Sequence, residues 1–171
     1  IVATQFHPEV AHTEEGKIFL NNFLFKIANC SPTWTAGNFI EEQIKLIRNQ
    51  VKEDKVIVGV SGGVDSTVVA ALLHKAIGDQ STAILIDHGM LRLNEAKNCV
   101  KALKDGLGVN IHCYDESEIF LSKLEAVTDP EKKRKIIGNQ FIYSFDSIAN
   151  EFGDIKYLSQ GTLYPDIIES G

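Results

Sequence analysis

Two kinds of hydrophobic pattern alternate along most of the chain. Short, continuous apolar runs that end at Gly or Asp are typical of strands buried on both faces. Longer segments with apolar residues three and four positions apart indicate amphipathic helices. In chain order the pattern predicts a helix at 39–50, a strand at 56–60, a helix at 64–77, a strand at 83–87, a helix at 94–107, a strand at 110–114, a helix at 130–152 and a strand at 155–158. Asp129 is the expected N-cap of the last helix, with Pro130 as its first residue.

This alternation predicts an α/β fold, a parallel sheet with helices on both faces. The first residues follow another pattern. Residues 1–6 favour a short strand and 14–28 an amphipathic helix. Residues 29–38 are polar, contain Pro and Gly and keep no period, so we place a linker at 31–38. The sequence therefore predicts a small strand-helix part, a linker and a larger α/β part.

Composition narrows the class of protein. Of 171 residues, 44% are hydrophobic and 23% charged, which is typical of a globular protein. The net charge of -6 argues against a general nucleic-acid binder, because such proteins need a basic face. No apolar run is long enough to cross a membrane. The chain begins at Ile1 rather than Met and carries motifs near both ends, so we expect a fragment of a longer protein.

The number and spacing of the cysteines indicate the redox environment in which the protein works. Cys30, Cys99 and Cys113 are odd in number, widely spaced and without a metal-ligand pattern, so they fit a reducing, cytoplasmic environment better than a disulfide framework. We expect all three to be buried free thiols.

The strongest chemical motif follows the strand at 56–60. Glycines allow a close backbone approach, a helix N-terminus offers unpaired N–H groups, and hydroxyls add donors. Together these features predict a pyrophosphate cradle, in which Asp65 could hold Mg²⁺. The residues of this loop are Ser61, Gly62, Gly63, Val64, Asp65, Ser66 and Thr67.

Three other interpretations of this loop compete with a pyrophosphate cradle. A Walker A loop requires a Lys that is absent here. Residues 59–63 match the G-x-S-x-G elbow of serine hydrolases, with Ser61 as nucleophile. The downstream histidines, His74, His88 and His112, fall too early for the usual triad order. The third alternative is a glycine turn without a ligand.

Residues 61–66, SGGVDS, resemble the loop of N-type ATP pyrophosphatases, which NAD synthetases and argininosuccinate synthetases share in variant forms. Residues 5–9, QFHPE, resemble the end of a class I glutamine amidotransferase domain. The remaining motifs are similar to those of glutamine-hydrolysing GMP synthases, namely residues 34–44, 87–92 (DHGMLR), 128–138 (TDPEKKRKIIG) and 160–170 (QGTLYPDIIES). The resemblance covers essentially the whole chain in the expected order.

The resemblance implies an adenine nucleotide alpha hydrolase-like, Rossmann-like domain at 39–171, truncated at its C-terminal end, after an amidotransferase tail at 1–30. In this family, ATP and Mg²⁺ serve to adenylylate XMP at its C2 oxygen. Ammonia from glutamine then displaces AMP to give GMP. The resemblance also implies a cytoplasmic homodimer for the full-length enzyme.

Site residues follow from the same resemblance. Residues 61–67 would bind ATP and Arg134 would bind XMP. His7 and Glu9 would belong to the Cys-His-Glu glutaminase triad, whose nucleophilic Cys is absent, so the chain should not hydrolyse glutamine. Asp87 and Arg92 stay undecided between a nucleotide role and a structural one, and Thr162, Asp166 and Glu169 lie in the last motif without assigned roles. The alternative function is a nucleotide-binding fragment without turnover.

Overall fold

The computed structural model describes residues 3–162 of the chain. The chain divides into two compact units, Ile1–Phe39 and Ile40–Gly171. Each unit is described by itself.

The smaller unit contains the short helix α1 (Gly16–Asn21), which continues as the π-helical turn η1 (Asn22–Ile27). The predicted helix at 14–28 therefore starts later, because Glu15 has a left-handed φ of 56°. The predicted strand at 1–6 is wrong for residues 3–6, which form a bend and pair with no strand in the described part of the chain. Residues 1–2 lie outside the described residues.

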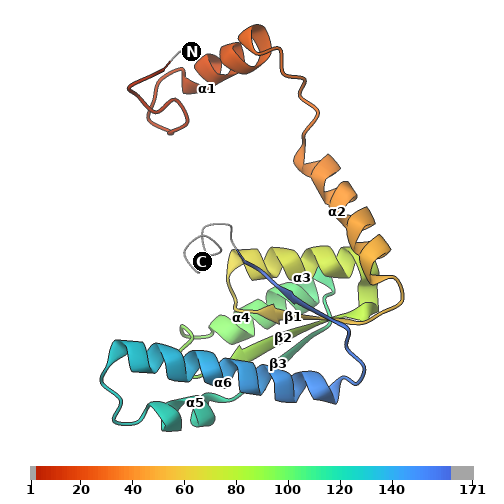
Figure 1. Cartoon of the computed structure of the whole chain (residues 1–171), viewed down its shortest axis with the longest axis vertical. Helices are drawn as coiled ribbons and strands as arrows, with labels where there is room; N and C mark the ends of the chain where they lie inside the picture. Colours follow the sequence, from red (N-terminus) through yellow and green to blue (C-terminus); the bar gives the residue numbers. More distant parts are fainter. Residues whose placement is uncertain (1–2, 163–171) are drawn as a thin grey trace. The chain divides into compact units, whose positions relative to one another are not determined.

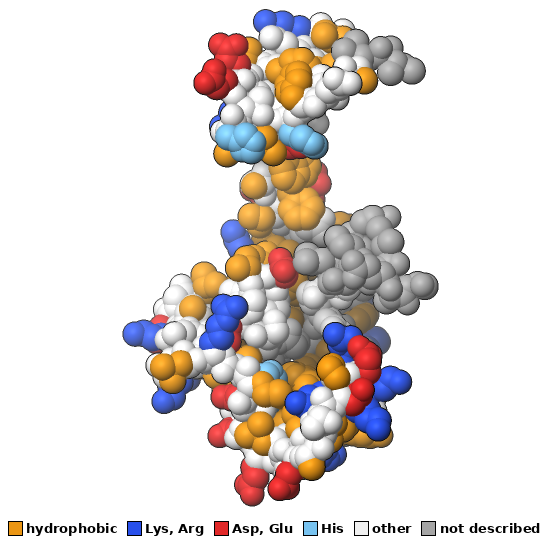
Figure 2. Space-filling view, turned by 90° about the vertical axis from the view of Figure 1, so that its left-hand side faces the viewer, with side chains coloured by type: hydrophobic (Ala, Val, Ile, Leu, Met, Phe, Trp, Pro, Cys, Tyr) orange, Lys and Arg blue, Asp and Glu red, His pale blue; other side chains and the backbone are white. Residues whose placement is uncertain are grey.

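Hydrophobic side chains stay at the surface of this unit, as Figure 2 shows. Phe6 and Phe19 contact each other edge to face, with ring centroids 5.5 Å apart. Both remain exposed, and so do Ile18, Phe23, Leu24, Phe25 and Ile27. The unit buries little apolar area of its own.

The larger unit is built on four parallel strands in the order β3-β2-β1-β4 (Figure 1). The strands are β1 (Val56–Val60), β2 (Ser81–Asp87), β3 (Ile111–Asp115) and β4 (Tyr157–Gln160). From residue 36 on, the helical elements are α2 (Ala36–Val51), whose first residues belong to the smaller unit, α3 (Val64–Ile77), η2 (Gly78–Gln80), α4 (Glu95–Lys101) with its continuation η3 (Ala102–Gly106), α5 (Ser117–Leu124) and α6 (Pro130–Glu151).

Alternate residues of the strands enter two separate cores. Val58 and Leu85 belong to the core that α2, α3 and α4 cover. Ile57 and Ile84 belong to the opposite core, which α5 and α6 cover through Phe120, Phe141, Phe145 and Ile148. Because helices cover both faces of a parallel sheet, the predicted fold class is confirmed.

Predicted and observed boundaries differ for clear reasons. β1 and α3 have the predicted bounds. α2 starts three residues before the predicted 39–50, because the Thr35 hydroxyl accepts the Asn38 N–H at 3.1 Å and caps the helix. β4 starts two residues late, since Ile155 packs into the core before the strand begins. The Asp129 carboxylate accepts the Lys132 N–H at 2.7 Å, which confirms the N-cap of α6.

The predicted burial of the cysteines was wrong, because Cys30 and Cys113 are exposed and Cys99 is half-buried. The prediction that all three are free thiols is confirmed. Desolvation raises the pKa of the Cys99 thiol and, together with the carboxylates of Asp87 and Asp115, the pKa of the Cys113 thiol above the ordinary value. Within residues 3–162, no helix is both long and apolar enough to span a membrane.

A polar seam joins α5 to α6 beneath the apolar core. The Lys123 ammonium donates to Gln140, the Gln140 amide donates to Ser144 Oγ at 2.9 Å, and Ser144 donates to the Glu116 carboxylate. Gln140 and Ser144 are only 7% and 3% exposed. Buried polar groups must be paired. This chain of hydrogen bonds therefore fixes the position of α6 relative to α5.

Ser144→Ala is expected to lower the free energy of unfolding by about 1–3 kcal/mol, because it leaves two polar groups unpaired in the interior. Urea denaturation of the chain measures this change. Ser147, exposed on the same helix, provides the matched control. Ser147→Ala should stay within about 0.5 kcal/mol of the unsubstituted chain. Equal effects of the two substitutions would remove the seam from the stability of α6.

Candidate functional site

The glycine loop lies at the carboxyl end of β1, in the middle of the sheet. β1 ends at Val60 and α3 begins at Val64. Gly62 has a φ of +84°, which an L side chain rarely adopts. Gly63 precedes the helix in an extended conformation and offers no side chain to cap it. The first N–H groups of α3 are therefore available to an anion at the loop.

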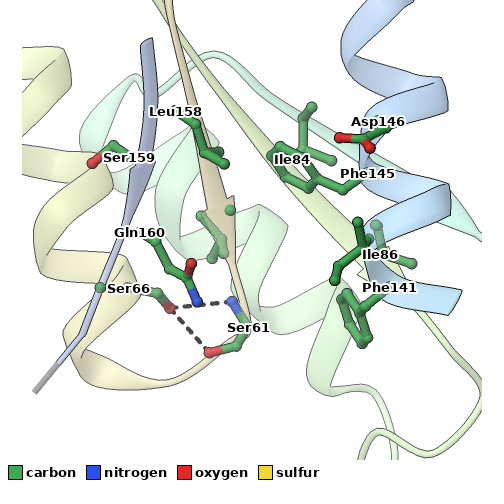
Figure 3. A pocket seen from close by; sticks show the side chains of 14 residues that line it. Ser61, Ser66, Ile84, Ile86, Phe141, Phe145, Asp146, Leu158, Ser159 and Gln160 are labelled. Carbon is green, nitrogen blue, oxygen red and sulfur yellow. Dashed lines mark hydrogen bonds between the residues drawn. The ribbon is translucent and has the colours of Figure 1, made fainter. Parts of the chain in front are cut away.

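Ser66 holds this loop together. Its side chain is buried, and its Oγ accepts the Ser61 N–H at 3.2 Å and donates to the Gly63 carbonyl at 3.2 Å. Ser61 Oγ lies 3.2 Å from Ser66 Oγ (Figure 3). Thr67 Oγ1 donates to the same Gly63 carbonyl at 2.8 Å. The hydroxyls thus shape the loop from within and accept the N–H groups of Ser61 and Gly63, the latter at 3.4 Å. The N–H groups of Gly62 and of the first turn of α3 remain to face a ligand.

The end of β4 packs directly against this turn. A Cβ added to Gly161 would lie 3.2 Å from both the N and the Cα of Ser66. Those contacts are with backbone, which cannot rotate away as a flexible side chain can. Sequence reasoning gave Gly161 no role, although a glycine directly after a predicted strand often marks a close backbone approach.

A cavity of about 360 Å³ opens beside the loop, between the sheet and α6 (Figure 3). Its lining is mostly apolar, with Ser61, Ser66 and Gln160 at the loop. The apolar wall is formed largely by Ile84, Ile86, Phe141 and Phe145. Gly59 leaves room in its floor, since a Cβ there would already lie 3.4 Å from the Phe145 ring. Such a cavity suits a flat apolar ring attached to an anionic group.

Acidic and basic groups around the loop have distinct surroundings. Asp65 is exposed in the first turn of α3, where it is the one acidic residue. Asp87 is the last residue of β2. Its carboxylate accepts the Gly89 N–H at 3.0 Å and so stabilises the turn that follows the strand. No group of three or more potential metal ligands occurs among the described residues. A metal ion here would therefore depend on oxygens of its own ligand.

Other predicted site residues lie apart from the cavity. The Arg134 side chain is 79% exposed and pairs with Glu131 at 2.6 Å. Arg134 does not line the cavity beside the loop. Thr162 is exposed. Asp166 and Glu169 lie outside the described residues.

The serine hydrolase alternative lacks its base. Within residues 3–162, the hydroxyl of Ser61 has no hydrogen bond to a histidine. His88 Nδ1 accepts the Met90 N–H at 3.1 Å, and the His112 ring contacts Phe152. The G-x-S-x-G match therefore reflects the shape of the turn rather than a triad.

His7 and Glu9 lie in the smaller unit. His7 Nδ1 donates to Glu9 Oε1 at 2.9 Å, and both side chains are exposed. A hydrogen bond from its own backbone, followed by the bond from His7, holds the pKa of Glu9 below the ordinary value. The pair has the geometry of a carboxylate that orients an imidazole.

A family model described as NAD synthase matches residues 38–140, more than half of the chain. The chain belongs to the NAD synthase family. Its α/β fold is also similar to that of the NH3-dependent NAD synthetase from Campylobacter jejuni, solved in complex with nitrate. The TM-score is 0.55 at 18% sequence identity, over 77% of this chain and 69% of that one. At this identity the likeness concerns the fold alone.

Sequence relatives of this family member are glutamine-hydrolysing GMP synthases. The protein from Paraburkholderia phymatum is 54% identical over 166 residues, 97% of this chain and 32% of that protein. The one from Carboxydothermus hydrogenoformans is 52% identical over 171 residues, 100% of this chain and 34% of that protein. The resemblance to GMP synthases is confirmed, and the chain spans about a third of the length of these curated relatives.

The His7–Glu9 contact predicts an acid titration. The carboxyl of Glu9 should titrate below 4.5, and His7→Ala should move its pKa part of the way back, because the backbone hydrogen bond remains. A lowered pKa means that the contact holds above the ordinary pKa and weakens as the pH falls through the lowered value. Carboxyl chemical shifts recorded by NMR against pH measure both values. An unchanged pKa in His7→Ala would show that the two side chains do not interact in solution.

Gly161→Ala should loosen the loop, because the new methyl group meets the backbone of Ser66. The Ser61 and Thr67 amides, which bond within the loop, should exchange with solvent faster. Gly106→Ala is the control, since a Cβ there meets nothing within 4 Å. Unchanged protection of both amides in Gly161→Ala would contradict a close packing of β4 on the loop.

Proposed function

We propose that this chain is the nucleotide-binding part of a glutamine-hydrolysing GMP synthase and that residues 61–67 bind ATP. One observation carries the proposal. The SGGVDS loop stands at a strand-to-helix turn with open N–H groups, in a chain more than half identical to GMP synthases over its whole length. In this proposal residues 1–30 end an amidotransferase domain, 31–38 form a linker, and 39–171 belong to the ATP pyrophosphatase domain.

The adenine ring fits the 360 Å³ cavity beside the loop. The cavity has apolar walls and an aromatic ring at Phe141, so a planar base would replace water against apolar surface. The polar atoms of Ser61 and Gln160 lie at the end of the cavity nearest the loop. The base would thus occupy the space over the sheet while the phosphates reach the glycine loop.

The loop would then hold the phosphates through main-chain N–H groups. Gly62 and the first turn of α3 would offer their N–H groups, and the N-terminus of α3 adds its partial positive charge. Cleavage between the α and β phosphates places negative charge on the departing pyrophosphate. Fixed donors aimed at developing charge stabilise a transition state without reorganisation. The hydrogen bonds of Ser66 keep these donors in place before the nucleotide arrives.

Mg²⁺ fits this arrangement as a partner of ATP. Mg²⁺ is usually held by one or two carboxylates together with phosphate oxygens and water. The exposed Asp65 supplies one carboxylate in the first turn of α3. When bound, the ion would neutralise phosphate charge.

The complete enzyme would join this half-site to the substrate XMP. Attack by the C2 oxygen of XMP on the α-phosphorus would release pyrophosphate, and ammonia from glutamine would then displace AMP to give GMP. Arg134 would bind the XMP phosphate or base, exchanging its exposed contact with Glu131 for a ligand. His7 and Glu9 would serve the glutaminase site. The full-length enzyme would be a cytoplasmic homodimer that binds neither nucleic acid nor membrane, and this chain alone would bind ATP with little or no turnover.

Calorimetric titration of the folded chain with ATP and Mg²⁺ tests the proposal. We expect binding that Asp65→Ala weakens by about tenfold or more, the loss of one charge-assisted contact. Asp79→Ala removes an equally exposed carboxylate beyond the other end of α3 and should leave the affinity unchanged. In excess chelator the difference between the unsubstituted chain and Asp65→Ala should vanish. No heat from a chain shown to be folded by circular dichroism would refute ATP binding at this loop.

A further inference from the structure

A second cavity, of about 380 Å³, lies on another side of the glycine loop. Gly62 and Thr67 line it from the loop and α3, and Arg92, Glu95 and Asn98 line it from the segment after β2. The first cavity touches the loop at Ser61 and Ser66 instead. The two cavities therefore meet the same turn through different residues.

Residues 92–95 are folded back toward the loop. The Arg92 N–H donates to Glu95 Oε2 at 2.7 Å, and Asn94 has a left-handed φ of 60°. The Glu95 side chain covers Gly62, with its Cγ 3.5 Å from where a Cβ of Gly62 would stand. Glu95 thus contacts both the Arg92 backbone and the glycine loop, so the segment after β2 packs against the loop.

Arg92 is the basic residue among those that line this cavity. Within residues 3–162 it forms no ion pair, because the three ion pairs of the described residues involve His7, Arg134 and Lys156. Glu95 lines the same cavity, and one of its carboxylate oxygens accepts the Arg92 N–H. An anion at this wall would therefore need the guanidinium to offset that carboxylate.

We propose that this second cavity receives the terminal phosphates of the nucleotide and that Arg92 binds them. The assignment rests on the proposed function, which puts the base in the first cavity and the phosphate chain on the loop. Gly62 lines the second cavity and adds no side chain of its own there, so Glu95 is the side chain that covers the loop at this point. A guanidinium donates two parallel hydrogen bonds to phosphate oxygens, which an ammonium cannot do.

The position gives Arg92 a part in the group transfer. As the XMP oxygen bonds to the α-phosphorus, the bond from that phosphorus to the oxygen bridging the β-phosphate breaks. The electron pair of this bond goes to pyrophosphate, whose negative charge rises. Arg92 would stabilise that charge as it develops, from the side opposite to the base.

Three ligands separate this role from a general effect. The full chain is titrated with ATP, with inorganic pyrophosphate and with AMP, each in the presence of Mg²⁺. Arg92→Ala should weaken ATP and pyrophosphate binding by about 10-fold to 100-fold, as expected for a charge-assisted hydrogen bond, and should leave AMP binding unchanged. Arg92→Lys keeps the charge without the planar fork and should fall between the two. Lys97→Ala removes an exposed cation of α4 that lines neither cavity, and should match the unsubstituted chain.

Each other outcome overturns the assignment in a distinguishable way. Equal losses of ATP affinity in Arg92→Ala and Lys97→Ala would indicate overall charge rather than contact. Equal losses for ATP and AMP would indicate damage to the site as a whole. Normal ATP binding in both Arg92 variants would refute the role of Arg92 and leave the proposed function intact. No ATP binding by the folded, unsubstituted chain would refute the proposed function and this assignment with it.

Discussion

The contact between the end of β4 and the first turn of α3 is the constraint on which the site depends. Gly161 stands where a Cβ would lie only 3.2 Å from the backbone of Ser66. Ser66 in turn fixes both sides of the glycine turn through hydrogen bonds to Ser61 and Gly63. The turn therefore depends on a strand from the far end of the described sequence as well as on its own residues. Because β1 pairs with β2 on one side and β4 on the other, the loop rises from the interior of the sheet.

The two faces of the sheet contribute differently to the structure around this turn. The face under α2, α3 and α4 is packed with aliphatic side chains and fixes the axis of α3, hence the direction of its first N–H groups. The face under α5 and α6 is looser near the end of β1, where Gly59 leaves space for the cavity. The hydrogen bonds of the polar seam fix the position of α6 over the cavity. An aliphatic contact alone would permit small slides of the helix, whereas paired buried polar groups do not.

Local sequence patterns correctly predicted those elements whose boundaries are set by their own residues. β1 and α3 were predicted to the residue, because the apolar run and the glycines that end it are local features. α5 was missed, since its eight residues are too few to show a helical period clearly. The strand predicted at 1–6 was wrong for residues 3–6, because a strand needs a partner that local sequence does not reveal. For the site, glycines and hydroxyls identified the turn. Glu95 contacts it from 33 positions further along the chain, at Gly62, and Gly161 from 95 positions further along, at Ser66, and only the fold shows such contacts.

The pairing of β1 with β4 also constrains the order in which the strands of the sheet can form during folding. The contact between Asp54 and Lys156 joins residues 102 positions apart. Closing such a long loop costs entropy before any contact repays it, so this pairing belongs to the slow end of folding. During synthesis, β1, α3 and β2 leave the ribosome well before β4 exists, and the glycine turn emerges without the strand that braces it. The cavity beside the loop, which residues of both β1 and β4 line, is thus complete only after β4 has paired with β1, and ligand binding there would report a paired sheet rather than an earlier intermediate.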